Sequence, residues 1–227
     1  MNRQTIEIEA RPYSTIGGVT VDESGRAILS SWSRWFTGLY AAGSSSCSGF
    51  HGADLLPGNQ MLDDLLGGAA AGVHAGEWVK NRKFANAQTA QDAEEAALAD
   101  HSAVSELSDE GVVRIGHVVT KVRDTIQSAL GYSRDAIGLE SAAVSLEAAS
   151  ILAESIHVDQ SSLIANSNIV EIARAQASAR LALASTQAAL ARKESRGCHH
   201  RTDFTDSDEE HLTHYTVDQH GEVNTLA

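Results

Sequence analysis

A run of small and polar residues between Gly38 and Gly72 has the composition of a ligand-binding loop. Its letters, GLYAAGSSSCSGFHGADLLPGNQMLDDLLGGAAAG, predict a short buried strand, a loop, and then a helix that begins near Asn59. The first turn of a helix presents backbone N–H groups without internal partners and carries a partial positive charge, which suits an anionic or electron-rich ligand edge. The same letters also fit an ordinary strand, loop and helix with Asn59 as the cap.

A second group of residues with reactive side chains lies near the C-terminus. It contains the side-chain types that bind metals, at Cys198, His199, His200, His211 and His214. Their spacing matches no standard zinc pattern, so we expect no metal here.

Changes in amino-acid composition divide the chain into three segments, which must position the two groups of candidate residues above. Twelve of the 18 glycines and both prolines lie within residues 1–82, whereas the following stretch is rich in alanine. Such a change separates a turn-rich mixed region from a helical one. We expect boundaries at 1–83, 84–197 and 198–227, the last being a polar tail that lies on the surface or is partly disordered.

The first segment predicts strands, a hairpin and one helix. Val19–Val21 and Ala27–Leu29 flank a good hairpin turn, and the helix should run from about Asn59 to Val79. Because that helix is rich in glycine and alanine, a sheet or a flat ligand should pack closely against it.

The second segment predicts three amphipathic helices. Asn168 should begin the last helix and Gly197 should follow its end. The apolar stripes are Val112, Ile115, Val119, Val122, Ile126 and Leu130; Val144, Ala148, Ile151 and Ser155; and Ala173, Ala177, Leu181, Ala184, Ala188 and Ala191. The expected fold is therefore α+β, with a strand-and-hairpin segment followed by an antiparallel three-helix bundle.

Charge and composition exclude several classes of function. The formal net charge of −13 argues against binding to nucleic acid or to anionic membranes. No apolar run approaches the roughly 20 residues that cross a bilayer, so we expect a cytoplasmic protein without membrane insertion. Two cysteines, Cys47 and Cys198, are too few for a disulfide framework or an iron–sulfur cluster within the chain.

Three segments resemble, in order, the C-terminal part of the flavoprotein family that contains fumarate reductase, succinate dehydrogenase and L-aspartate oxidase. Residues 16–26 are similar to the family's His-Tyr-Thr-Met-Gly-Gly-Ile hairpin. Residues 38–62 are similar to Gly-Leu-Tyr-Ala-x-Gly-Glu followed by His-Gly-Ala-Asn-Arg-Leu-x-x-Asn-Ser-Leu-Leu. Residues 190–204 are similar to the Glu-Ser-Arg-Gly motif that closes the last long helix. The resemblance covers roughly residues 5–205.

The resemblance implies a bound FAD and assigns residues to it. The family's loop glutamate, which bonds the ribityl chain, corresponds to Ser44, next to Gly43. The pyrimidine edge of the flavin would lie against the helix start, at Asn59, Gln60, Met61 and Leu62. Reduced flavin carries negative charge at this edge, which a helix N-terminus stabilises.

The substrate side departs from the family pattern. The resemblance places one wall of the substrate pocket at Tyr13, His51 and Leu55. Leu55 stands where the family has an arginine that clamps a dicarboxylate, and Tyr13, or Pro12 with a shifted gap, stands where the family has a histidine. His51 is retained, in a role that is either structural or functional. We therefore expect a substrate that is less acidic than a dicarboxylate.

The family's Gly-x-Gly-x-x-Gly turn, which cradles the FAD pyrophosphate, and its substrate-capping domain have no counterpart in the sequence. We expect a partner chain to supply the glycine-rich fold and to share the FAD. Met1 before a plausible strand favours a split subunit over a truncated remnant. The leading hypothesis is thus one subunit of an FAD-dependent oxidoreductase acting on a small-molecule substrate. The alternative is a non-catalytic interaction subunit that kept the fold.

Overall fold

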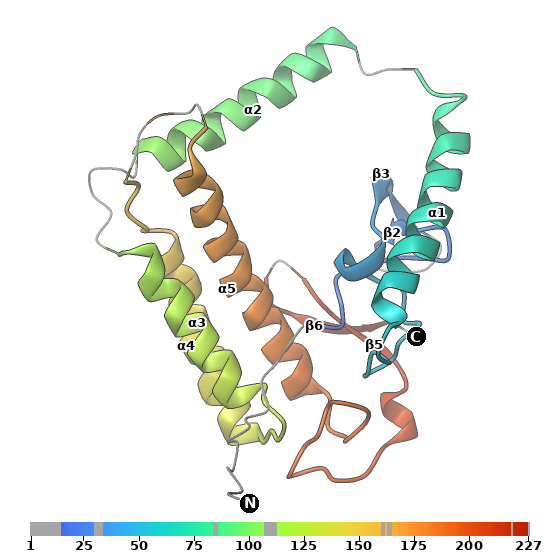
Figure 1. The fold of residues 1–227 in the computed structure, drawn as a ribbon, viewed down its shortest axis with the longest axis vertical. Helices are drawn as coiled ribbons and strands as arrows, with labels where there is room; N and C mark the ends of the chain where they lie inside the picture. The colour runs from blue at the N-terminus through green and yellow to red at the C-terminus, as the bar shows by residue number, and fades with distance from the viewer. Residues whose placement is uncertain are drawn as a thin grey trace, which may run out of the picture.

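The computed structural model describes residues 15–29, 34–83, 86–106, 113–159, 162, 165–218 and 220–226. Within these residues the chain is α+β, with five α-helices and a few short strands, which confirms the predicted fold class. Figure 1 shows the first strands and α1 on one side, the helices α3 to α5 on the other, and a C-terminal hairpin between them.

The predicted hairpin turn is present, with an antiparallel bridge between Val21 and Ala27, but each of its two strands pairs mainly with another strand. Strand β1 (Val19–Thr20) leads through a turn into β2 (Arg26–Ile28), which pairs antiparallel with β3 (Trp35–Tyr40), while β1 pairs parallel with β4 (Ser46–Cys47). The Asp22 carboxylate stabilises the turn by accepting hydrogen bonds from the backbone N–H groups of Ser24 and Arg26 at 2.9 and 3.0 Å.

The strand predicted at Gly38 is present, but it is not buried as predicted. β3 covers part of that stretch, but most of its residues are exposed, including Phe36 and Leu39. An apolar strand reads as buried from its sequence alone, but burial requires a layer on both faces. Helix α1 (Asn59–Val79) contacts β3 through Trp78 against Trp35 and His74 against Tyr40, and this contact leaves Phe36 and Leu39 exposed.

Helix α1 has the predicted bounds, Asn59–Val79. Its small residues allow the close approach that the sequence predicted, and the close neighbour is the strand region. A Cβ on Gly25 in the hairpin turn would lie 2.7 Å from the Ala71 Cβ, and one on Gly67 would lie 3.6 Å from the Ala42 Cβ. Glycine and alanine on both sides therefore allow the helix to lie directly on the hairpin and on the loop after β3.

The second segment contains one helix more than the sequence predicted. Helix α2 (Ala87–Glu106) precedes α3 (Ile115–Ala129), α4 (Ala136–Ala153) and α5 (Ser167–Ala191). Figure 1 shows α2 running from the end of α1 towards the other helices. The last three helices pack on one another around a common core, whose buried members include Val118, Val122, Leu146, Ala149, Ile172, Ala175, Ala179 and Ala182.

Two of the predicted apolar stripes lie on the wrong face, and one is displaced in part. Val144, Ile151 and Leu181 are more than half exposed, and Val119 is 46% exposed. The faces that α4 and α5 actually bury are Leu139, Ala142, Leu146, Ala149 and Ala153, and Ile172, Ala175, Ala179, Ala182, Thr186 and Ala189. Because alanine and aliphatic residues surround both helices, spacing alone does not choose between neighbouring stripes.

The ends of α5 also differ from the prediction. The N-cap is Asn166, whose side chain accepts a hydrogen bond from the Asn168 backbone N–H, so Asn168 is not the cap. The helix ends at Ala191, and Gly197 lies six residues further along, in a loop with φ of 56°.

Helix α4 is long and apolar enough to cross a membrane by length and composition alone. A single such helix is weak evidence, because the core helix of a soluble protein passes the same test. One face of α4 carries Leu139 and Leu146, which are fully buried.

The segment after residue 197 is folded rather than the expected polar surface tail. It ends in an antiparallel hairpin of β5 (His214–Val217) and β6 (Val223–Leu226), which packs on α5. The polar composition of this segment does not predict that it folds, because a buried arginine, rather than an apolar cluster, organises its first part.

Arg201 is 1% exposed and holds the end of α5 in place. Its Nη1 donates to the backbone carbonyls of Ala189, Leu190 and Arg192, and its Nε and Nη2 both donate to the Asp203 carboxylate at 2.8 Å. The last carbonyls of a helix have no internal hydrogen-bond partner and carry partial negative charge. A guanidinium supplies both the missing hydrogen bonds and a compensating positive charge. The hydrogen bonds from Arg201 in turn hold the pKa of Asp203 well below its usual range.

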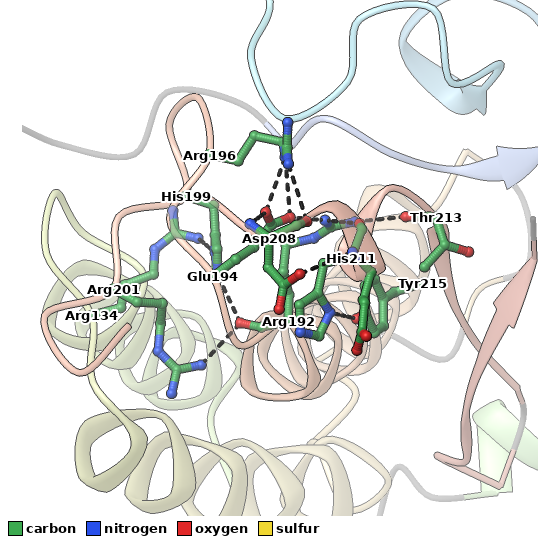
Figure 2. A network of polar contacts seen from close by, with 11 residues as sticks. Arg134, Arg192, Glu194, Arg196, His199, Arg201, Asp208, His211, Thr213 and Tyr215 are labelled. Atoms are coloured by element: carbon green, nitrogen blue, oxygen red, sulfur yellow. Dashed lines mark hydrogen bonds and ion pairs between the residues drawn. The ribbon is translucent and has the colours of Figure 1, made fainter. Parts of the chain in front are cut away.

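A second polar network ties residues 192–215 together (Figure 2). The fully buried Glu194 carboxylate pairs with Arg192 at 2.5 Å and with Arg196 at 3.0 Å, and it accepts from the Asp208 backbone N–H. Burial alone would raise the pKa of Glu194, but these hydrogen bonds outweigh burial and the pKa is lowered. The Arg192 guanidinium also donates to the carbonyls of His211 and Thr213.

His199 links this network to the turn between α3 and α4. Its Nε2 donates to the Arg192 carbonyl at 3.1 Å, and its Nδ1 accepts from Arg134 Nη1 at 2.9 Å. The pKa of His199 is lowered to about 4, chiefly by burial; the hydrogen bond to the Arg192 carbonyl opposes this shift, and the charges of Arg134, Arg192 and Arg201 add to it. Neutral imidazole with its proton on Nε2 satisfies both partners.

We predict that Arg201→Met lowers the free energy of unfolding by about 3 kcal/mol, because the α5 carbonyls and Asp203 lose their partner. Arg201→Lys should recover only part of the loss, since lysine lacks the planar fork. Chemical denaturation measures both. Arg174→Met is the control, because Arg174 is 69% exposed and its pair with Glu171 contributes less than about 1 kcal/mol. Equal losses in the two Met variants would contradict the role of Arg201.

We also predict that His199 makes stability depend on pH between 6.5 and about 4. Its pKa is lowered on folding, so the unfolded chain binds the extra proton first and stability falls as pH drops through this window. The loss should reach about 3 kcal/mol at the acid end. In His199→Gln, the difference in unfolding free energy between the two pH values should shrink by that amount. A variant with an unchanged pH profile would contradict this assignment.

Candidate functional site

The first turn of α1 is open at its N-terminus, as a ligand-binding turn requires. Its N-cap is Gly58, in the left-handed conformation at φ of 87°, and no side chain caps the turn. Asn59 is the first helical residue and not a cap, which removes the alternative of an ordinary Asn-capped helix. Met61 and Leu62 follow it and are 70% and 49% exposed. The Asn59 backbone N–H donates to the Leu56 carbonyl at 3.1 Å, and no side chain of the described residues caps the turn.

Asp64 of α1 holds the first of two loops against the helix. The loop after β3 forms a short 3₁₀ turn at Gly43–Ser45, and the Ser44 backbone N–H donates to Asp64 Oδ1 at 3.1 Å. Gly43 is buried at φ of 61°, and a Cβ there would lie 1.9 Å from the same carboxylate oxygen. Gly43 therefore permits the approach that brings Ser44 beside the start of α1.

Asp63, the preceding residue of α1, faces the second loop. The His51 side chain is 13% exposed, and its Nε2 lies 3.5 Å from Asp63 Oδ2. The Nε2 atom is buried and has no hydrogen-bond partner among the described residues. Since buried polar atoms are normally satisfied, His51 has an unused hydrogen-bonding position at this site.

The structure thus brings most of the expected site residues together. Gly43, Ser44 and His51 lie against the same first two turns of α1 that carry Asn59, Gln60, Met61 and Leu62. Leu55, half-buried, lies in the same connection to α1, after the exposed Asp54. Tyr13 and Pro12 lie outside the described residues.

Asp63 and Asp64 are the site residues that sequence reasoning did not assign. In the sequence they are two acidic residues in an apolar helix, which usually marks a solvated face. Their adjacency offers a signal in retrospect, because consecutive helical residues point about 100° apart and so can hold two different loops.

Comparison with known proteins identifies two parts of the chain. The protein-family model for the FAD binding domain matches residues 5–61, and the model for the fumarate reductase flavoprotein C-terminal region matches residues 119–226. The first match contains the two loops and the first residues of α1 in the candidate site, up to Met61, and agrees with the FAD cofactor that the sequence predicts. The second match contains α4, α5 and the C-terminal hairpin.

Curated relatives match nearly the whole chain but only a part of their own length. The fumarate reductase flavoprotein subunit of Mycobacterium tuberculosis is 30% identical over 219 residues, which cover 92% of this chain and 36% of that protein. The succinate dehydrogenase flavoprotein subunit of Rickettsia bellii is 26% identical over 229 residues, covering 98% of this chain and 38% of that protein. The chain therefore spans about a third of these relatives.

Solved structures share the fold. A variant of E. coli quinol fumarate reductase FrdA superposes with a TM-score of 0.79 at 20% identity, over 93% of this chain and 36% of that chain. Mycobacterium smegmatis Sdh1 superposes with a TM-score of 0.72 at 22% identity, over 94% of this chain and 35% of that chain. With both family models matching in order, the chain is similar to the C-terminal part of the fumarate reductase and succinate dehydrogenase flavoproteins.

Proposed function

We propose that the chain is one part of an FAD-dependent oxidoreductase and that it binds the pyrimidine edge of the flavin. When bound, the flavin would exchange a hydride at N5 with a carbon of a small-molecule substrate. The family's activity belongs to proteins about three times as long, so catalysis by this chain requires residues that it does not contain. The chain's own contribution is one side of the cofactor site.

The observation that carries this proposal is the uncapped first turn of α1 beside two loops. Among the described residues no side chain caps that turn, and its N–H groups, apart from the Asn59 N–H that donates to the Leu56 carbonyl, would stabilise the negative charge that reduced flavin holds near its pyrimidine ring. Asp64 fixes the Ser44 backbone, and the buried His51 Nε2, which has no hydrogen-bond partner in the described part of the chain, lies near Asp63. These groups suit the polar edge of a flat ring.

The remainder of the flavin fold should come from a partner chain that carries the glycine-rich turn. Support comes from α1 and β3, which expose large apolar side chains at Phe36, Leu39, Met61, Leu65, Leu66 and Val73. A helix with so many exposed apolar residues is normally buried in its working assembly. We assign this surface, defined by those six residues, to the partner chain.

The substrate should be less acidic than a dicarboxylate. Leu55 cannot donate a hydrogen bond to a carboxylate, and the neighbouring Asp54 is exposed and would repel one. The proposed pocket wall at Leu55 and His51 is thus mixed, with one apolar side chain and one imidazole.

We predict that the purified chain retains flavin absorbance only together with a partner chain that bears a Gly-x-Gly-x-x-Gly turn. Leu65→Lys should reduce capture of both the partner and the flavin at least about tenfold, because it places a charge in the docking surface. Leu181→Lys, at a residue of similar exposure on α5, is the matched control and should retain both. A folded, colourless chain that captures no such partner would instead favour the non-catalytic interaction subunit.

We predict that Leu55→Arg changes turnover of fumarate-like acids by less than about tenfold in the assembled enzyme. The second clamp residue of the family is also replaced in this chain, and Asp54 would compete for the new guanidinium. Steady-state kinetics measure the change, with Leu56→Arg as a control for added charge on the same loop. A large gain in Leu55→Arg alone would overturn the proposed substrate class.

A further inference from the structure

The loop that carries His51 is held by the C-terminal segment of the chain, more than 140 residues away in sequence. One contact is made by Gly197, at φ of 56°. A Cβ at this position would lie 2.9 Å from both the backbone carbon and the oxygen of Ala53, and 3.0 Å from the Asp54 Cβ. Only glycine permits this approach, because both the backbone conformation and the space exclude a side chain.

Cys198, the next residue, makes two hydrogen bonds to the Ala53 carbonyl oxygen. Its backbone N–H donates to the Ala53 carbonyl at 3.1 Å, and its thiol Sγ approaches the same oxygen at 2.7 Å. Burial raises the pKa of the Cys198 thiol, and the Asp54 carboxylate raises it further, so the thiol keeps the proton that it donates.

A contact from β5 holds the other end of the loop. Gly49, at φ of 75°, lies against the imidazole of His214, and a Cβ on Gly49 would lie 2.2 Å from the His214 Cε1. Residues 49–54 are therefore contacted at one end by His214 and at the other by Gly197 and Cys198. His51 lies between these two points of contact.

The residues that hold the loop are themselves anchored to the helices. Arg134, in the turn between α3 and α4, donates through Nη2 to the Cys198 carbonyl, and its backbone carbonyl accepts from the Thr202 N–H at 2.8 Å. Arg201 fixes the same segment to the end of α5. A continuous series of contacts thus runs from the helices to the loop at residues 49–54.

We propose that Gly197, Cys198 and His214 are positioning residues that clamp residues 49–54 and so fix His51 beside α1. The clamp couples the helical part of the chain to the candidate flavin site. Its role in that site rests on the proposed function, whereas the clamp itself is a property of this chain alone.

The first test measures backbone amide hydrogen exchange in the full chain, without flavin. Gly197→Ala should speed exchange in peptides covering residues 49–54 at least about tenfold, because the new Cβ pushes the loop away. Gly221→Ala is the control, since Gly221 is also left-handed, at φ of 81°, and its nearest neighbour is the end of the Gln187 side chain. Equal exchange rates at 49–54 in the two variants would overturn the clamp.

The second test uses Cys198 and avoids a steric change. Cys198→Ala removes the side-chain donor to Ala53 and should raise exchange at 49–54 several-fold, whereas Cys198→Ser retains a donor and should restore most of the protection. If Ser and Ala behave alike, the thiol contact does not hold the loop and the proposal fails in this part.

The third test asks whether the clamp matters to the cofactor site. In the complex with the flavin-bearing partner, Cys198→Ala should shift the flavin absorption spectrum and Cys198→Ser should not. Loss of flavin in every variant and in the parent chain would refute the proposed function but leave the exchange result intact. Faster exchange at 49–54 with an unchanged spectrum would refute only the coupling to the flavin.

Discussion

The described structure depends on one buried cation at the end of a helix. Arg201 satisfies carbonyls of α5 that have no helical partner and fixes the direction in which the chain leaves the helix. Burying a guanidinium is costly unless its donors are satisfied, and the Asp203 carboxylate supplies the remaining partners. From this point the chain can return towards the first strands instead of continuing as a surface tail.

The return of the chain brings two distant regions into contact. Glu194 pairs with Arg192 and Arg196 in a polar network just after α5 (Figure 2), and Gly197 and Cys198, in the same segment, contact the loop at 49–54. Apolar packing could fill the same space. Charge-assisted hydrogen bonds, however, also fix the orientation of the segment after α5, and this orientation places Gly197 and Cys198 against Ala53. The site loops are held from α1 by Asp63 and Asp64 and from the C-terminal segment by Gly197 and Cys198.

Elements with strong local signals could be predicted from the sequence. The hairpin turn at Asp22 and the bounds of α1 follow from residues that are close together, and so does the α+β class. The faces of α4 and α5 could not be chosen, because alanine and aliphatic side chains lie on several sides of each helix and only the neighbouring helices decide which stripe is buried. The burial of the apolar strand near Gly38 could not be predicted for a related reason, since only its contacts with α1 decide which of its side chains are covered.

The sequence by itself indicated the family and the stretch that we propose to face the flavin, because the residues of those motifs are contiguous and their types are restricted by turns and helix starts. Through the same resemblance it indicated that Leu55 and Tyr13 stand in place of the family's arginine and histidine. Only the tertiary structure decided which residues support that stretch. Asp63, Asp64, Gly197, Cys198 and Arg201 act through contacts between segments far apart in the chain. Residue types and spacing within one segment do not predict such contacts, because each contact depends on where the fold places a second, distant segment.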